Sequence, residues 1–560
     1  MTKTKVLLLS LIASSAIAEP VPATCDAQHE VDKYQLLRRL SLDLRGRVPS
    51  FAEYNALDSQ STVPVTQVKA FLTTDDFRVV MRRYHEELFW PNVSNVKLNN
   101  VNAQLQLTAL KTPGSTAYML GSAGRKLNYR NEPDLTTVTN GRGCGDFEQT
   151  TFDPAFPGQF RIDPASASVY KEVQGAKTVY QEGYRLVHPY WDPTPTSMVK
   201  VCAFDAQETP TVVIGTKTVS CGDVAANGQK ACGCGANLRF CYGPAAMVAN
   251  AITTSLREQL GRSIDKVTVG GKPYTDLLLS SKADVNGPIS YWKRFMSYDL
   301  SLSRIYAIPD VSEDSGNFDF TDTTWHEIDR NDPASGEASA KLHSGVVTLP
   351  AYLLRFQTNR GRANRFRIDF ECDSFTPPSS IESPGTGTPA CLSSGTDLTG
   401  RCTCRYCHRI LEPLAAGFGQ FAEAGTTVLA SAAFPRMSAG CKGSSSAFCG
   451  RFYVTDNDDS NPGALLPYQY ADAAHPTIAA ALAAGPKKRA NEIIADGTFA
   501  RCSVKRMFSQ LVKRDMHVIG AELEELPLLT TLADGFRTNG YSLPWLVEQM
   551  VSLPQYRRVR

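Results

Sequence analysis

The sequence predicts a mainly α-helical protein, with several helical domains and a loop-rich, disulfide-bearing middle segment that contains short β-strands. Three observations support this fold class. Apolar residues recur at helical spacing toward both ends of the chain. The segment 135–242 is instead rich in Gly, Pro, Thr and Cys, with short β-prone runs such as 210–215. The length of 560 residues exceeds what one hydrophobic core usually supports, so several domains are expected.

Residues 1–18 have the features of a secretory signal peptide. Lys3 and Lys5 precede an apolar run at 6–12, and Ala-Ile-Ala at 16–18 has the small-x-small form of a cleavage site. The mature chain is therefore predicted to begin at Glu19. The alternative, a retained membrane anchor, is disfavoured because the apolar run is too short to span a bilayer. No later segment is apolar for long enough either, so no transmembrane segment is expected in the mature chain.

An N-terminal helical domain is expected over residues 30–130. Apolar residues have helical spacing in much of 31–90, including the stretch Thr74–Trp90. Ser50 is placed to cap a helix, and Glu53 stands in the position that completes a capping box.

A cysteine-rich loop and strand segment follows over 135–242. Its densest cluster is Cys232, Cys234 and Cys241. Structural disulfides are the favoured interpretation, because exported proteins can keep them. A zinc site is the alternative, but the spacing lacks a paired C-x-x-C and no histidine is near. The pairing is left open by the sequence, although Cys441 and Cys449 flank a Gly/Ser-rich loop and form the simplest local pair.

Helical patterns dominate the rest of the chain. A helical domain is expected over 243–375, preceding and packing on the next domain, with a polar excursion at 308–342. A further domain at 388–470 contains the motif described below, and a last helical domain covers 475–560. The helical stretches expected between residues 243 and 375 are Pro244–Leu260, Tyr274–Arg304 and Pro350–Phe370.

Charge excludes one class of partner. The chain has 58 Lys and Arg residues against 56 Asp and Glu residues. This balance argues against a broad nucleic-acid footprint, which requires clustered positive charge. The hydrophobic fraction of 42% is typical of a globular protein.

The pentapeptide Cys404-Arg405-Tyr406-Cys407-His408 has the form C-x-x-C-H. This is the attachment signature of c-type haem, in which the two thiols form thioethers with the haem vinyl groups and the histidine is the proximal iron ligand. The signal peptide favours this interpretation, because c-type haem is attached after export. The sequence has no second C-x-x-C-H, so one covalent haem is expected. From Cys404 a helix is predicted to reach about Glu412, where Pro413 would stop it.

The motif has two alternative interpretations. The cysteines could be structural, with an incidental histidine beside them. A thioredoxin-like dithiol would follow a β-strand in a βαβ setting, which the residues 388–403 do not resemble.

The sixth iron ligand is less defined by the sequence. Met437 is the candidate closest after the motif, although an ordinary loop or core methionine is the favoured interpretation of it. His326, His343 and His475 are further candidates, each favoured as structural or surface residues. An open sixth position is the remaining alternative, and it would permit peroxide or oxygen chemistry.

The residues after the motif suggest a family. The motif continues as RILEPL over 409–414, with Phe418, Phe421 and Gly425 beyond. This segment resembles the haem segment of planctomycete-type cytochrome c domain proteins, where Ile-Asp-Pro usually stands in place of Leu-Glu-Pro. Further stretches resemble other parts of the same proteins: 37–50 the N-terminal domain, 273–288 the domain before the haem segment, 343–366 the start of the haem-bearing domain, and 499–515 its small C-terminal helical domain.

The resemblance implies an exported, multidomain, monohaem c-type cytochrome with a cytochrome c-like haem domain, in a family of largely unassigned function. Three functions follow as hypotheses: electron transfer, a haem-dependent oxidase or peroxidase acting on an exported substrate, and a cell-envelope binding or scaffold protein with a structural haem. The expected partner is a redox protein or an exported small molecule or polymer. The expected location is the periplasm or the surface of a bacterial cell.

Overall fold

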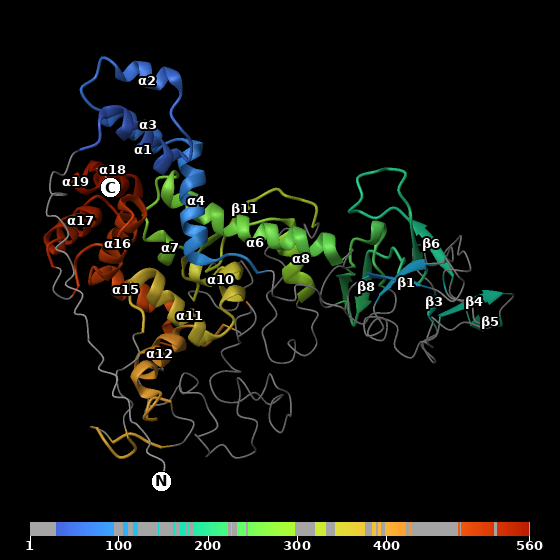
Figure 1. Cartoon of the computed structure of the whole chain (residues 1–560). Coiled ribbons are helices and arrows are strands. Elements are labelled where there is room, and N and C mark those ends of the chain that lie inside the picture. Colours follow the sequence, from blue (N-terminus) through green and yellow to red (C-terminus); the bar gives the residue numbers. More distant parts are fainter. Residues whose placement is uncertain are drawn as a thin grey trace, which may run out of the picture.

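The computed structural model shows that the described part of the chain is about half helical and also contains short strands (Figure 1). The expected signal peptide, the Cys441–Cys449 pair and Met437 lie outside the residues that it describes. These are residues 30–93, 105–109, 116–120, 144, 161–162, 169–173, 176–179, 183–221, 226, 232–241, 243, 245–296, 320–331, 342–375, 383–387, 390–393, 398–421, 426, 480–481, 483–519 and 523–558.

Most of the described helices form one body with a continuous hydrophobic core that runs from Leu36 to Tyr556. The helices predicted at 31–90 and in the C-terminal segment are confirmed. The N-terminal helices are α1 (Lys33–Arg45), α2 (Phe51–Leu57), α3 (Val65–Phe71) and α4 (Asp75–Phe89), and the C-terminal ones are α15 (Pro486–Ala495), α16 (Thr498–Val512), α17 (Leu526–Thr538), α18 (Leu543–Ser552) and α19 (Pro554–Arg557).

The first and last helices of this body lie side by side. The Val31 amide donates a hydrogen bond to the Arg557 carbonyl at 2.9 Å. The Tyr556 hydroxyl, on α19, donates to the Asp43 carboxylate on α1 at 3.0 Å. The guanidinium of Arg39 lies 4.2 Å from the centre of the Tyr556 ring. The expected N-terminal and C-terminal helical domains are therefore parts of one folded unit.

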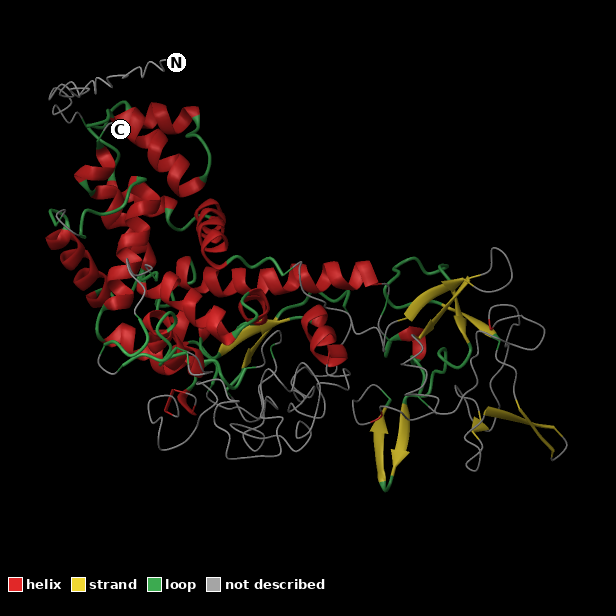
Figure 2. Cartoon of the chain, turned by 60° about the horizontal axis from the view of Figure 1, so that its bottom comes forward, coloured by secondary structure: helices red, strands yellow, loops and turns green. Residues whose placement is uncertain are grey.

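A long helix, α6 (Ala245–Thr268), extends from this body toward the strand-rich middle segment (Figure 2). Its length is about 36 Å at the rise of an α-helix. A four-stranded sheet in that segment has the order β1-β2-β7-β6. The described strands there are β1 (Leu105–Ala109), β2 (Thr116–Leu120), β3 (Arg161–Ile162), β4 (Val169–Val173), β5 (Ala176–Val179), β6 (Tyr184–Val187), β7 (Val199–Cys202), β8 (Thr211–Ile214) and β9 (Lys217–Ser220).

This sheet changes where the expected N-terminal helical domain ends. Residues 30–130 were predicted as a helical domain, but β1 and β2 belong to the sheet with β7 and β6. Tyr118 of β2 pairs in parallel with Val201 of β7, far along the chain. The N-terminal helical part therefore ends at α4, because the pairing partner that makes residues 105–120 strands comes from a distant segment.

Cysteine pairing in the middle segment is confirmed as disulfide. Cys232, Cys234 and Cys241 are all bonded to other cysteines, which leaves no thiolates there for the alternative zinc site. Five disulfides are present among the described residues. They join Cys144 with Cys202, Cys221 with Cys232, Cys234 with Cys241, Cys372 with Cys502, and Cys391 with Cys402.

The helix predicted at Tyr274–Arg304 is wrong in its first half. The structure has the short helix α7 (Asp276–Leu279), then the strand β10 (Lys282–Val285), then α8 (Gly287–Met296). β10 forms an antiparallel pair with β11 (His326–Asp329), which comes from the expected polar excursion. Because the partner strand is distant in sequence, local spacing alone favoured a continuous helix.

The stretch predicted as one helix at Pro350–Phe370 is also divided. It forms α10 (Pro350–Arg355), α11 (Asn359–Phe366) and a π-helical turn, η9 (Arg367–Glu371). After the break, α11 is capped at its N-terminus by Thr358, whose hydroxyl accepts a hydrogen bond from the Gly361 amide at 2.9 Å. A short 3₁₀ turn, η8 (Gly345–Thr348), precedes α10.

Gly345 in η8 is fixed by a close approach of two backbone segments. Its φ is +47°, and a Cβ placed there would lie 2.0 Å from the carbonyl oxygen of Leu277. Only glycine fits this contact without displacing α7.

Ser50 and Glu53 form the capping box that the sequence predicts at the start of α2. The Glu53 amide donates to the Ser50 hydroxyl at 3.3 Å, and the Ser50 amide donates to the Glu53 carboxylate at 2.7 Å. Arg45 donates to the same carboxylate at 2.6 Å. Burial raises the pKa of Glu53, but the hydrogen bonds from Arg45 and Ser50 outweigh it and lower the pKa from 4.5 to about 2.

The Glu53→Gln variant should lose stability in a pH-dependent way. Because the pKa is lower in the folded chain, the contribution is fully present above about pH 4.5 and is lost as the pH falls toward 2. After allowance for solvent screening, we expect the free energy of unfolding to fall by about 2 kcal/mol at pH 7 and by less than half of that at pH 3. Urea unfolding at both pH values measures it. Glu87→Gln, on an exposed position of α4, is the control, and an equal loss in both variants would contradict the assignment.

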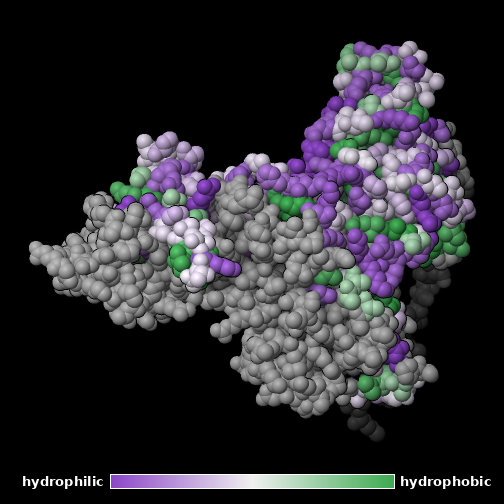
Figure 3. All heavy atoms as spheres, turned by 180° about the vertical axis from the view of Figure 1, so that it is seen from behind, coloured by the Kyte–Doolittle hydropathy of each residue, from purple (hydrophilic) through white to green (hydrophobic). Residues whose placement is uncertain are grey.

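The surface of the helical body is mixed. Hydrophilic residues predominate on the face in Figure 3, with apolar residues interspersed among them. In the part of the chain that the structure describes, no helix is both long and apolar enough to cross a membrane.

Candidate cofactor site at the start of α12

The C-x-x-C-H motif lies at the beginning of α12 (Arg405–Gly417), which packs against α11 and α15. Cys404 is the N-cap residue, and Cys407 and His408 follow in the first turn. The amides of Cys407 and His408 both donate to the Cys404 carbonyl, at 3.2 and 3.1 Å. The helix therefore begins within the motif, and its first turn brings the two sulfur atoms and the imidazole to one end.

α12 does not end at Pro413, contrary to expectation. The helix continues through this proline to Gly417. Proline removes one backbone hydrogen bond, that to the carbonyl four residues before it. Residues on both sides of it, including Leu411, Ala415 and Ala416, are buried in the core. Burial of this face holds the helix together across the missing bond.

A disulfide loop precedes the motif and is hydrogen-bonded to its helix. Cys391 and Cys402 are bonded, and Leu392 and Arg401 form a parallel bridge inside the loop. The Arg405 amide, at the first position of α12, donates to the Arg401 carbonyl at 2.8 Å. The loop therefore connects directly into the first turn of the helix.

Cys404 and Cys407 differ from every other described cysteine. All ten of the others are paired in the five disulfides, whereas Cys404 and Cys407 are free and partly exposed. Thioether formation requires free, accessible thiols. The donor set at the start of α12 therefore fits covalent attachment of a c-type haem.

His408 is oriented by a carboxylate that the sequence interpretation did not assign to the site. Its Nδ1 lies 2.5 Å from Oε1 of Glu412, one turn further along α12. Arg360 of α11 donates from Nε to the same oxygen at 2.7 Å. Among the described residues, Nε2 of His408 has no hydrogen-bond partner, so it is the nitrogen that is free to bind iron. The spacing of four residues on a helix is the sequence signal that could have identified Glu412.

The candidates for the sixth ligand are placed only in part. Met437 and His475 lie outside the described residues. His326 is exposed on β11. His343 is buried, and its ring contacts the ring of Phe421, with the centroids 5.9 Å apart. Arg330 lies 3.1 Å from its Nδ1. His343 is therefore packed in the interior against Phe421, which follows α12 in the chain.

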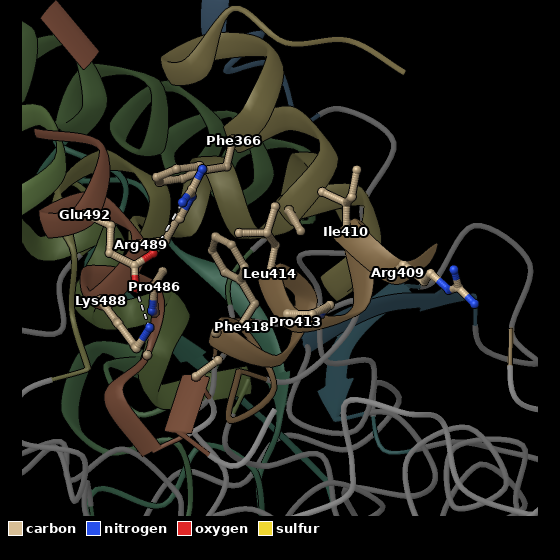
Figure 4. Close-up of a pocket in the computed structure, with 14 residues that line it drawn as sticks. Phe366, Arg409, Ile410, Pro413, Leu414, Phe418, Pro486, Lys488, Arg489 and Glu492 are labelled. Carbon is tan, nitrogen blue, oxygen red and sulfur yellow. Dashed lines mark hydrogen bonds and ion pairs between the residues drawn. The ribbon is translucent and has the colours of Figure 1, made fainter. Parts of the chain in front are cut away.

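A pocket of about 270 Å³ lies between α11, α12 and α15 (Figure 4). Ile410 and Leu414 of α12 contribute to its apolar wall, and on the α15 side Glu492 pairs with Lys488 and Arg489. Neither His408 nor Glu412 lines it. The pocket is therefore on a different face of α12 from the candidate haem ligands.

No group of three or more His, Cys, Asp or Glu side chains within the described residues is arranged to hold a bare metal ion. Comparisons of the chain with protein-family models, with curated proteins and with solved structures each gave no match.

Proposed function

We propose that this chain is an exported monohaem c-type cytochrome that binds one haem c covalently and transfers electrons. The observation that carries the proposal is the state of the cysteines. Only Cys404 and Cys407 are unpaired among the described cysteines, and both stand beside His408 in the first turn of a helix. A random pair of structural cysteines in an exported protein would be expected to form a disulfide like the others.

Each residue of the motif has a distinct role in the proposal. Cys404 and Cys407 anchor the haem through thioethers, and His408 supplies Nε2 as the proximal ligand. Glu412 accepts a hydrogen bond from Nδ1 and holds the ring. When bound, the haem supplies one-electron redox chemistry. A cytochrome c-like fold for residues 388–470 and membership of the planctomycete-type cytochrome c domain family belong to the same proposal.

The proposed location is the periplasm or the bacterial cell surface, and the proposed partner is a redox protein or an exported small molecule or polymer. The disulfides support export, because a reducing cytosol rarely permits five of them in one chain. The signal peptide expected at residues 1–18 supports it independently.

Expression of the full chain together with haem-maturation machinery tests the proposal. We expect a band that stains for haem after denaturation, because a thioether linkage survives unfolding. Visible spectra of the oxidised and reduced protein then report the axial ligands. A reduced protein that does not bind carbon monoxide supports an electron carrier with both axial positions filled, whereas binding would favour the oxidase or peroxidase hypothesis. An unstained wild-type chain contradicts the proposal.

A further inference from the structure

We propose that Glu412, held in place by Arg360, is a positioning residue that orients His408 and lowers the reduction potential of the haem. The inference rests on the proposed function, because it requires His408 to bind the iron. It adds a specific determinant of the redox chemistry, the contact between a buried carboxylate and the proximal histidine.

The geometry joins three side chains through one oxygen atom. Oε1 of Glu412 lies 2.5 Å from Nδ1 of His408 and 2.7 Å from Nε of Arg360. The Glu412 side chain is fully buried, with an exposed fraction of 0%, whereas 20% of the His408 side chain is exposed. The carboxylate is therefore directed from the interior toward an imidazole at the surface.

The secondary structure fixes this contact. His408 and Glu412 are four residues apart on α12, where side chains lie one above the other. Arg360 comes from α11, which packs along α12. Rotation of the Glu412 side chain would leave the guanidinium without this acceptor and the carboxylate without its cation, which is costly in the interior.

The remaining oxygen of Glu412 adds to this effect. Oε2 is buried and has no hydrogen-bond partner among the described residues. A buried carboxylate with one unsatisfied oxygen is a strong hydrogen-bond acceptor, and among the described residues only Arg360 and His408 bond to this one. Nδ1 of His408 lies within hydrogen-bond distance of the other oxygen of this carboxylate, Oε1.

This contact acts on the iron through the imidazole ring. A histidine that donates Nδ1–H to a carboxylate is a more basic ligand at Nε2 than one that donates to a neutral oxygen. A more basic ligand and a nearby negative charge both favour the ferric over the ferrous state. The guanidinium of Arg360 opposes the charge effect in part. Glu412 and Arg360 are therefore expected to shift the potential in opposite directions.

A purely structural role for Glu412 would give a different result. If its only function were the ion pair with Arg360, loss of either partner would destabilise the fold but would leave the potential of the attached haem unchanged. Measurement of the reduction potential separates the two roles. The direction in which each variant shifts the potential from the wild-type value is the decisive quantity.

The experiment compares the reduction potentials of haem-loaded full-length variants by redox titration. Glu412→Gln keeps the shape and an acceptor oxygen but removes the charge. We expect it to retain the haem stain and to raise the ferrous-to-ferric ratio at a fixed solution potential about tenfold, which is about 59 mV for a one-electron couple. Arg360→Gln should shift the ratio the other way. Glu412→Asp, which restores the charge, should recover part of the wild-type value.

Glu371→Gln is the matched control. Glu371 also has a largely covered side chain, 6% exposed, and it pairs with Arg489 at 2.8 and 2.9 Å, but it has no contact with His408. We expect it to reduce stability without changing the potential. If Glu412→Gln carries haem with an unchanged potential, or if both site variants move the potential in the same direction, the inference is wrong while the proposed function stands. A wild-type chain without haem overturns both.

Discussion

Replacement of both Cys404 and Cys407 by alanine should abolish covalent haem attachment completely. These are the only unpaired cysteines among the described residues, so no other described thiol can take their place. Cys402 lies only two positions before the motif, but its sulfur is bonded to that of Cys391. Haem staining after denaturing electrophoresis, normalised to protein, measures the effect.

A second double variant controls for general damage. Cys234→Ala with Cys241→Ala also removes two cysteines, but it breaks a disulfide in the middle segment, remote in sequence from α12. It should keep the full haem stain. A stain that persists in the Cys404 and Cys407 variant would contradict the assignment of the site, and loss in both variants would show that staining depends on folding instead of on these two thiols.

Among the five described disulfides, removal of Cys372–Cys502 should give the largest loss of stability. This bond connects the end of η9 to α16 and has a sequence separation of 130 residues. By the loop-closure entropy of the unfolded chain, its loss in Cys372→Ala with Cys502→Ala should lower the free energy of unfolding by about 5 kcal/mol. Denaturant unfolding followed by helical circular dichroism measures this, because both ends of the bond lie in the helical body.

The length of the closed loop provides the comparison. The Cys234–Cys241 bond has a sequence separation of only 7 residues, so the same relation gives about 2 kcal/mol for its loss. Equal effects in the two variants would contradict the entropic explanation. Such a result would indicate that local packing around each bond determines its contribution.

Local features of the fold followed from the sequence. The Ser50–Glu53 capping box, the helix within Thr74–Trp90 and the strand at 211–214 are where local patterns predict them. Each depends on residues within a few positions of one another. The helix predicted at Tyr274–Arg304 failed because β10 is a strand only when β11 pairs with it.

The candidate site also combines a local pattern, visible in the sequence, with a contact between distant segments. The pattern of Cys404, Cys407 and His408 is local and was visible as a motif. Arg360 was not, because 52 residues separate it from Glu412 and only the packing of α11 on α12 brings them together. The helix was predicted to reach about Glu412 and to stop at Pro413. It continues past Pro413 because the buried face of α12 is held by the core.

The sequence by itself determined the chemistry available to this protein: two thiols and an imidazole at fixed spacing, and many cysteines in a chain for which an export signal is predicted. These depend on residue identity and short-range geometry. Only the tertiary structure decided that Cys404 and Cys407 stay free while their neighbours pair, and that a buried carboxylate orients His408. It also decided that the first and last helices share one core. Such contacts join distant segments, and burial in a common interior selects them.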